Sequence, residues 1–178
     1  RSITIAGTHG KTTITTIISN LLDGFGLNVD VVNGGIINSY NSNYKIGAGN
    51  LIVAESDESD GSFANLKTDI AVISNIEPEH MEYYNNDFAK VIQFYENYIK
   101  STKEVVIICL DDPQLFNLYN KLKNKVNFIT YGEREIADFS LKSFSQNKKG
   151  ICFSFYSKID GKEFNDIKVG LYGLHNAK

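Results

Sequence analysis

The sequence predicts an α/β fold in which a mostly parallel sheet is flanked by helices. Up to Thr130, short β-branched runs alternate with helical patterns. This alternation is typical of parallel strands joined by right-handed crossovers. After Tyr131-Gly132 the pattern changes to short strand-like runs separated by turn residues, at 139–144, 151–156 and 164–169. These runs predict a small antiparallel meander near the C-terminal end of the sheet.

The parallel part is assigned element by element from the period of its apolar residues. Helices are expected at 11–23, from Asp87 as N-cap, and from Pro113 to about Lys123. The first has an apolar face of residues 14, 17, 18, 21 and 22 and is expected to stop at Gly24. A glycine- and asparagine-rich stretch at 33–50 reads as one long loop. The expected strands are residues 3–6, 29–32, 51–54, 70–74, 104–110 and 126–130.

The segment between the first strand and the first helix has the features of a phosphate-binding loop. Gly7 and Gly10 can adopt backbone angles that let a loop curl around an anion. The helix that follows offers unpaired amides and a positive dipole end. Lys11 adds a full charge for terminal phosphates, and the Thr12 hydroxyl can bind Mg²⁺. The usual loop has a further glycine at the position of Ile5, so this is a shorter variant of a P-loop-type fold.

Composition narrows the class of protein. A hydrophobic content of 42% with 22% charged residues is that of a soluble globular protein, and 178 residues fit one large domain. The net charge of −3 argues against broad nucleic-acid binding. No apolar run approaches a membrane span and no signal peptide is visible, so we expect no membrane insertion and a cytoplasmic location. Cys109 and Cys152 lack metal-type spacing and are expected to be reduced core thiols.

The two ends of the sequence suggest a piece of a longer protein. The chain starts with Arg1 rather than Met, directly before a strand. It stops at Lys178, where a helix is expected to begin.

Two residues after strands are candidate magnesium ligands. Glu55 ends the third strand, and ligands of open α/β sheets bind at the carboxyl ends of strands. A solvated acidic loop is the alternative, and for Asp57, Glu58 and Asp60 we favour it or a helix-capping role. His80 follows the fourth strand, where it could bind a divalent ion or have a purely structural role; the bare residue leaves both open.

Four segments together resemble the Mur ligases of peptidoglycan synthesis, and most of all their central ATP-binding domain. The C-terminal Gly173 to Asn176 resembles the motif of that family near the adenine. The similarity runs from Ser2 to Asn176, although Lys100 to Val169 matches only in layout. The four segments are residues 7–13, 33–36, 54–63 and 74–80.

The resemblance implies roles for individual residues. Lys11, Glu55 and His80 would be catalytic, and magnesium would be held by Thr12, Glu55 and His80. His175 and Asn176 would lie near the adenine. A family asparagine three residues beyond Asn176 would fall past the end of this sequence, and we assign no carbamylated lysine. The nucleotide-binding residues would be Gly7, Thr8, His9, Gly10, Lys11, Thr12, Thr13, His175 and Asn176.

The resemblance also implies an activity, the ATP- and Mg²⁺-dependent joining of L-alanine to the lactyl carboxylate of UDP-N-acetylmuramate through an acyl phosphate. Residues 1–178 would be the central domain of a three-domain protein. Flanking N- and C-terminal domains would bind the sugar nucleotide and the amino acid, so this chain alone would only bind Mg-ATP. A sister ligase that joins a recycled peptide to the same nucleotide is one alternative. A non-catalytic ATP-binding module is another.

Overall fold

The computed structural model describes residues 1–38, 41–57, 68–79 and 81–176. These residues form one ten-stranded sheet in the order β10-β9-β8-β7-β6-β5-β1-β4-β2-β3. Its parallel strands are β1 (Ser2–Ala6), β2 (Asp30–Ile37), β4 (Ile52–Glu55), β5 (Ile70–Ile73), β6 (Val105–Cys109) and β7 (Phe128–Gly132). The predicted α/β class with a mostly parallel sheet is confirmed.

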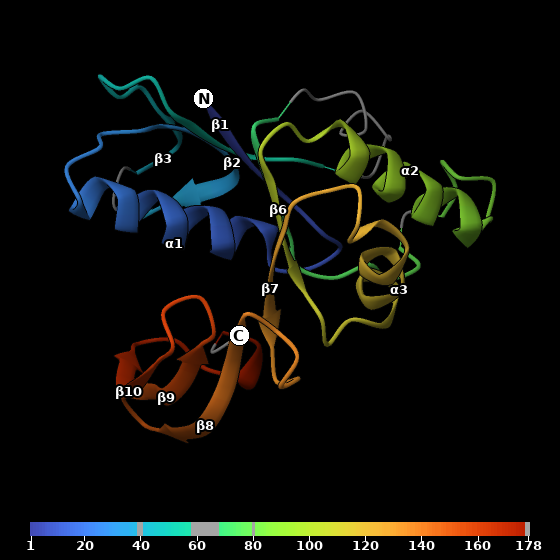
Figure 1. Cartoon of the computed structure of the whole chain (residues 1–178). Helices are drawn as coiled ribbons and strands as arrows, with labels where there is room; N and C mark the ends of the chain where they lie inside the picture. The colour runs from blue at the N-terminus through green and yellow to red at the C-terminus, as the bar shows by residue number, and fades with distance from the viewer. Residues whose placement is uncertain (39–40, 58–67, 80, 177–178) are drawn as a thin grey trace.

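Helices cover both faces of the parallel part. Helix α1 (Lys11–Gly24) lies on one side of the sheet, and α2 (Phe88–Ser101) and α3 (Pro113–Leu122) lie on the other (Figure 1). Side chains alternate between the two faces along each strand. On β1, Ile5 joins the cluster packed under α1, while Ala6 joins the cluster that contains the buried residues of α2 and α3.

The Asp87 cap of α2 and the position of Pro113 in α3 are as predicted, whereas the Asp112 cap of α3 was not predicted. The Asp87 carboxylate accepts a hydrogen bond from the amide of Ala89 at the start of α2. The Asp112 carboxylate accepts from the amides of Gln114 and Leu115, and Pro113 occupies the first turn of α3. These caps satisfy amides that have no partner within the helix, so each helix begins where its capping residue is placed.

The meander is formed by β8 (Phe139–Asn147), β9 (Gly150–Ser157) and β10 (Lys162–Val169), which pair antiparallel to one another. It continues the main sheet, because β8 pairs in parallel with β7, where Tyr131 of β7 lies opposite Phe139 of β8. The prediction of an antiparallel meander near the C-terminal end is therefore confirmed.

Several details differ from the sequence prediction, and Cys152, expected in the core, is only half-buried. The expected loop at 33–50 is wrong in part, because β2 extends to Ile37 and a strand β3 (Ser42–Lys45) pairs with it as an antiparallel edge. Leu21 of α1 is 56% exposed, since its position lies at the margin of the apolar face. Strand β7 begins at Phe128, two residues later than expected.

Candidate functional site

The carboxyl ends of the parallel strands meet at one edge of the sheet, and the candidate site lies there. Gly7 follows β1, Glu55 ends β4, and Ser74 to Glu77 follow β5. This edge is where open α/β sheets bind ligands. The candidate residues were expected at this edge from the sequence, and those that the structure describes lie there.

The loop between β1 and α1 depends on two glycines with positive φ. Gly7 has φ 134°, and a Cβ there would lie 2.2 Å from the Ser74 hydroxyl oxygen. Gly10 has φ 84° and is the residue before the first turn of α1. A side chain at Gly7 would have to displace Ser74 and would also be strained, so the loop passes against β5 only because this residue is glycine.

The segment after β5 holds the loop in place. The amide of His9 donates to the Asn75 Oδ1 atom (2.8 Å), and the Asn75 amide group donates back to the His9 carbonyl (3.0 Å). The backbone amide of Thr8 donates to the Asn75 carbonyl (3.1 Å). The Ser74 hydroxyl also donates to the His9 carbonyl (2.8 Å). Because the amides of Thr8 and His9 are used in this way, the amides available to an anion are those further along the loop and in the first turn of α1.

The side chains of Thr8 and His9 also face the segment after β5. The amide of Glu77 donates to the Thr8 hydroxyl (2.8 Å). The His9 imidazole is 53% exposed, with its Nε2 atom 3.6 Å from a Glu77 carboxylate oxygen and 3.3 Å from one of Glu79. His9 therefore joins the loop to the stretch that leads toward position 80.

The Lys11 side chain curls back over the loop. Its amine donates to the carbonyl of Gly7 (2.7 Å) and to the carbonyl of Thr8 (3.3 Å). A lysine held by two loop carbonyls keeps its positive charge at the loop, where phosphate oxygens would meet it.

Thr12 and Glu55 lie in contact, as the sequence argument expected. The Thr12 hydroxyl donates to the Glu55 Oε2 atom (2.9 Å), and the backbone amide of Gly34 donates to the same oxygen (2.8 Å). A Cβ on Gly34 would come within 3.0 Å of this carboxylate. The glycines of β2 thus let the backbone pass close to this pair.

The residues present fit a magnesium ion, although a metal role for them stays a prediction. A hydroxyl and a carboxylate are the hard oxygen donors that Mg²⁺ prefers, and Mg²⁺ is commonly held by one or two protein oxygens together with phosphates and water. Among the described residues, no three His, Cys, Asp or Glu side chains form a metal-binding group. His80, the third expected ligand, lies outside the described residues, and so do Glu58 and Asp60 of the acidic stretch.

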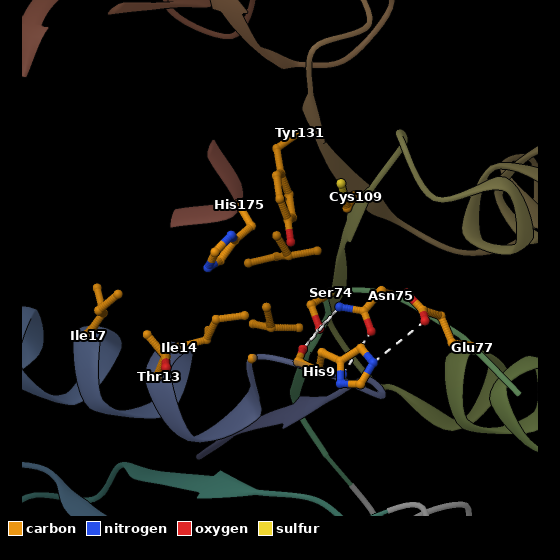
Figure 2. Close-up of a pocket in the computed structure, with 13 residues that line it drawn as sticks. His9, Thr13, Ile14, Ile17, Ser74, Asn75, Glu77, Cys109, Tyr131 and His175 are labelled. Carbon is orange, nitrogen blue, oxygen red and sulfur yellow. Dashed lines mark hydrogen bonds and ion pairs between the residues drawn. The ribbon is translucent and has the colours of Figure 1, made fainter. Parts of the chain in front are cut away.

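A cavity of about 720 Å³ opens beside the loop and extends along α1. Its volume is within the range of about 300–1,000 Å³ that is usual for small-molecule sites. His9 and Thr13 lie at one end, and Tyr131 and His175 lie at the other (Figure 2). Gly10 also lines the cavity. The wall between these ends is mostly apolar and is lined by Ile14, Ile17, Val72, Ile107 and Cys109.

The C-terminal segment reaches this cavity because the meander holds it. The amide of Gly173 donates to the Gln146 side-chain oxygen (2.8 Å), and the Tyr172 hydroxyl donates to the Lys148 carbonyl (2.9 Å). Gly173 has φ 94°, and a Cβ there would collide with the His175 imidazole. His175 lies in the short helix η2 (Leu174–Asn176) and lines the cavity. The side chain of Asn176, also expected here, lies outside the described residues.

Tyr131, Cys109 and Asn75 are cavity residues to which the sequence argument gave no role. Their positions could have indicated them, because each lies at or just after the carboxyl end of a parallel strand. Burial raises the pKa of the Tyr131 hydroxyl well above its ordinary value, helped by the nearby Cys109, Asp111 and Asp112. A tyrosine hydroxyl is protonated at neutral pH with or without this shift, so Tyr131 can donate a hydrogen bond.

Comparison with known proteins gives the family. The family described as "Mur ligase middle domain" matches residues 5–178. The chain belongs to the Mur ligase family. It is 39% identical over 181 residues to the UDP-N-acetylmuramate--L-alanine ligase of Bradyrhizobium diazoefficiens, and 38% identical over 182 residues to that of Phenylobacterium zucineum. The alignments cover 98% and 99% of this chain but only 38% of each relative, so the chain spans well under half the length of these proteins.

Solved structures agree with this family. The UDP-N-acetylmuramate-alanine ligase MurC of Thermotoga maritima has a TM-score of 0.82 at 25% identity, covering 99% of this chain and 38% of that one. The MurF ligase of Thermotoga maritima, solved in complex with ADP, has a TM-score of 0.72 at 23% identity, covering 92% of this chain and 39% of that one. At that identity, MurF supports the fold alone. Within the part of this Mur ligase chain that the structure describes, no helix is long and apolar enough to cross a membrane.

Proposed function

We propose that residues 1–178 are the nucleotide-binding part of a cytoplasmic, ATP-dependent ligase that joins L-alanine to the lactyl carboxylate of UDP-N-acetylmuramate. The relatives support the ligase assignment, and the geometry of the site supports nucleotide binding. Relatives with the name of this ligase match the chain over nearly its whole length. The observation that carries nucleotide binding is the contact of Thr12 with Glu55 at the phosphate loop, because this pair supplies oxygen donors where the terminal phosphates would lie.

In this proposal each part of the site has a separate task. The first-turn amides of α1, the loop from Gly7 to Thr13 and the Lys11 amine bind the phosphates of ATP. Thr12 and Glu55, together with His80, would hold the Mg²⁺ that accompanies them. Bound Mg²⁺ would neutralise phosphate charge, so that the γ-phosphate and a carboxylate, both anionic, could approach. His175 and Asn176 would lie near the adenine.

The residues of this chain need not supply a nucleophile. The lactyl carboxylate attacks the γ-phosphate of ATP, and an acyl phosphate and ADP result. The amine of L-alanine then attacks the acyl carbon, and phosphate leaves as the amide bond forms. Positioning and charge stabilisation supply most of what such a reaction requires. The sugar nucleotide and the amino acid would be bound by flanking N- and C-terminal domains of a longer protein, with no role for nucleic acid or a membrane.

Replacement of Lys11 tests nucleotide binding. Lys11→Ala removes a cation beside several phosphate charges and is expected to weaken Mg-ADP binding by about 1.5–3 kcal/mol, the range for hydrogen bonds to charged groups. Titration calorimetry of the chain measures this directly. Lys158→Ala, which removes an exposed lysine directly after β9, serves as the control. Equal affinities of wild type and Lys11→Ala for Mg-ADP would refute the assignment of the loop.

Phosphate release separates the ligase from its rivals. The chain alone, given ATP, UDP-N-acetylmuramate and L-alanine, is expected to release phosphate only at the background rate. A longer protein that contains it should release phosphate when L-alanine is added. If release required an alanine-containing peptide instead, the sister ligase would be the correct assignment, and no release with either would favour a non-catalytic ATP-binding module.

A further inference from the structure

We propose that Tyr131 contacts the base of the bound nucleotide and donates a hydrogen bond to it. This proposal rests on the proposed function, because it takes the phosphates to bind at the loop. It adds a base-contacting residue to the site, at the end of the cavity opposite the loop.

The direction of the cavity fixes where a base would lie. His9, Gly10 and Thr13 mark the phosphate end, where α1 begins. Ile14 and Ile17 follow on α1, and Ile17 is about 4.5 Å further along the helix axis than Ile14. A nucleotide whose phosphates bind at the first turn must therefore extend along this helix, with its base beside Ile17. Opposite, the cavity is closed by Tyr131 and His175 (Figure 2).

The lining at this end suits a flat aromatic base that needs one polar partner. Ile14, Ile17 and Ile107 offer apolar surface against which the face of a base can pack. A base also has polar ring nitrogens, and leaving these unpaired in an apolar cavity is costly. At this end the lining residues with polar side chains that hydrogen-bond well are Tyr131 and His175, because the thiol of Cys109 is only a weak donor.

The position of the Tyr131 side chain suits such a contact. Its side chain points from β7 into the cavity, toward α1 and the loop (Figure 2). None of the hydrogen bonds among the described residues uses its hydroxyl. Its backbone is fixed, since its carbonyl accepts from the amide of Leu110 (2.8 Å) and β7 pairs with both neighbouring strands. A fixed backbone and a protonated, unused hydroxyl in a cavity are what recognition of a base requires.

A core-packing role is the alternative, because the Tyr131 ring also packs against the cluster under α3. Tyr131→Phe separates the two readings, since it keeps the ring and removes only the hydroxyl. Tyr119→Phe is the matched control, because Tyr119 packs against Phe128 and does not line the cavity.

The test compares two ligands, Mg-ADP and Mg-tripolyphosphate, by titration calorimetry of the chain. Tyr131→Phe is expected to weaken Mg-ADP about three- to ten-fold, the loss of one hydrogen bond, and to leave Mg-tripolyphosphate unchanged. Tyr119→Phe should change neither. Thermal unfolding without ligand should show Tyr131→Phe folded at the temperature at which the titrations are made.

The outcomes are distinct from those for the proposed function. If Lys11→Ala loses both ligands while Tyr131→Phe binds Mg-ADP as the wild type does, the role of Tyr131 is refuted and the loop assignment stands. Equal weakening of both ligands by Tyr131→Phe would show a structural effect and would also refute it. A wild-type chain that binds neither ligand would overturn both proposals.

Discussion

Glu55 is the side chain on which the proposed magnesium site most depends. Its carboxylate already accepts two hydrogen bonds, from the Thr12 hydroxyl and the Gly34 amide, and these fix its position at the end of β4. A charged oxygen held in this way can bind a cation without reorganisation. It also repels phosphates when no cation is present, so its effect on nucleotide affinity should change sign with Mg²⁺.

Glu55→Gln is therefore predicted to change the affinity for ADP in opposite directions with and without Mg²⁺. With Mg²⁺ the variant should bind ADP at least roughly ten-fold more weakly, because a charged ligand of the metal is lost. With EDTA it should bind ADP as well as or better than the wild type, because a negative charge near the phosphates has been removed. Calorimetry in both conditions measures the change, with the distant Glu135→Gln as control. A variant with unaltered Mg²⁺ dependence would rule out Glu55 as a ligand.

The sequence predicted the residues of the loop but not those that support it. Lys11 and Thr12 were found because their spacing from Gly7 and Gly10 is a local pattern. Asn75 was part of a recognised segment, yet its two hydrogen bonds with His9 join residues far apart in the chain. Such a contact depends on β5 lying next to β1, and that neighbourhood is a property of the folded sheet.

At the scale of elements, the N-terminus of α3 is linked to the segment that braces the loop. One oxygen of the Asp112 carboxylate caps α3, and the other accepts from the amide of Ile76 (3.0 Å), directly after Asn75. Asp87 performs only the capping task for α2, with one amide. The two caps therefore form a natural comparison.

Asp112→Ala is predicted to destabilise the protein more than Asp87→Ala. Loss of a helix cap costs about 0.5–2 kcal/mol, and Asp112→Ala should reach the upper part of this range because a further amide loses its partner. Urea unfolding of both variants measures the difference. Equal losses of stability would mean that the contact with Ile76 contributes nothing.

The elements that were predicted correctly are those with strong local signals. Asp87, Pro113 and the apolar runs of β1 and β5 each indicate an element from neighbouring residues alone. The hairpin of β2 and β3 was missed, because Gly34 and Gly35 are poor strand formers. They lie within β2 between Val32 and Ile37, where the pairing with β3 is irregular, and having no side chain they let the backbone approach Glu55 and Thr12 closely.

At the scale of the whole molecule, one continuous sheet brings distant segments to a single cavity. The phosphate loop comes from the N-terminal end of the chain and His175 from the C-terminal end, which the meander holds through Gln146 and Lys148. The sequence predicted the meander as a group of strands. It could not show that the meander positions the C-terminal segment, because those hydrogen bonds involve long-range partners.

A charged contact links segments at the amino ends of the parallel strands. It predicts that the stability of the fold decreases in acid. The Asp69 carboxylate accepts from the Lys103 amine (2.8 Å) and from the amide of Ser2 (2.8 Å). These bonds, that from Lys103 above all, lower the pKa of Asp69 from 3.8 to about 2. A carboxyl whose pKa is lower in the folded state stabilises the fold above about pH 4, and this contribution is lost as the pH falls toward 2.

Asp69→Asn is accordingly predicted to remove part of the pH dependence of stability. Between pH 4 and 2, the unfolding midpoint in urea should fall less steeply for the variant than for the wild type. Glu163→Gln, at an exposed position on β10, is the control. Identical slopes for Asp69→Asn and the wild type would show that the contact does not contribute.

A crystal structure of the chain with Mg²⁺ and a non-hydrolysable ATP analogue is the most direct test of the proposed site. We expect the β- and γ-phosphates to contact the loop from Gly7 to Thr13, and Mg²⁺ to contact Thr12 and Glu55. The base should lie along α1 between Ile17 and Tyr131. A nucleotide bound elsewhere, or a magnesium ion at the phosphates that neither Thr12 nor Glu55 contacts, would contradict the proposed site.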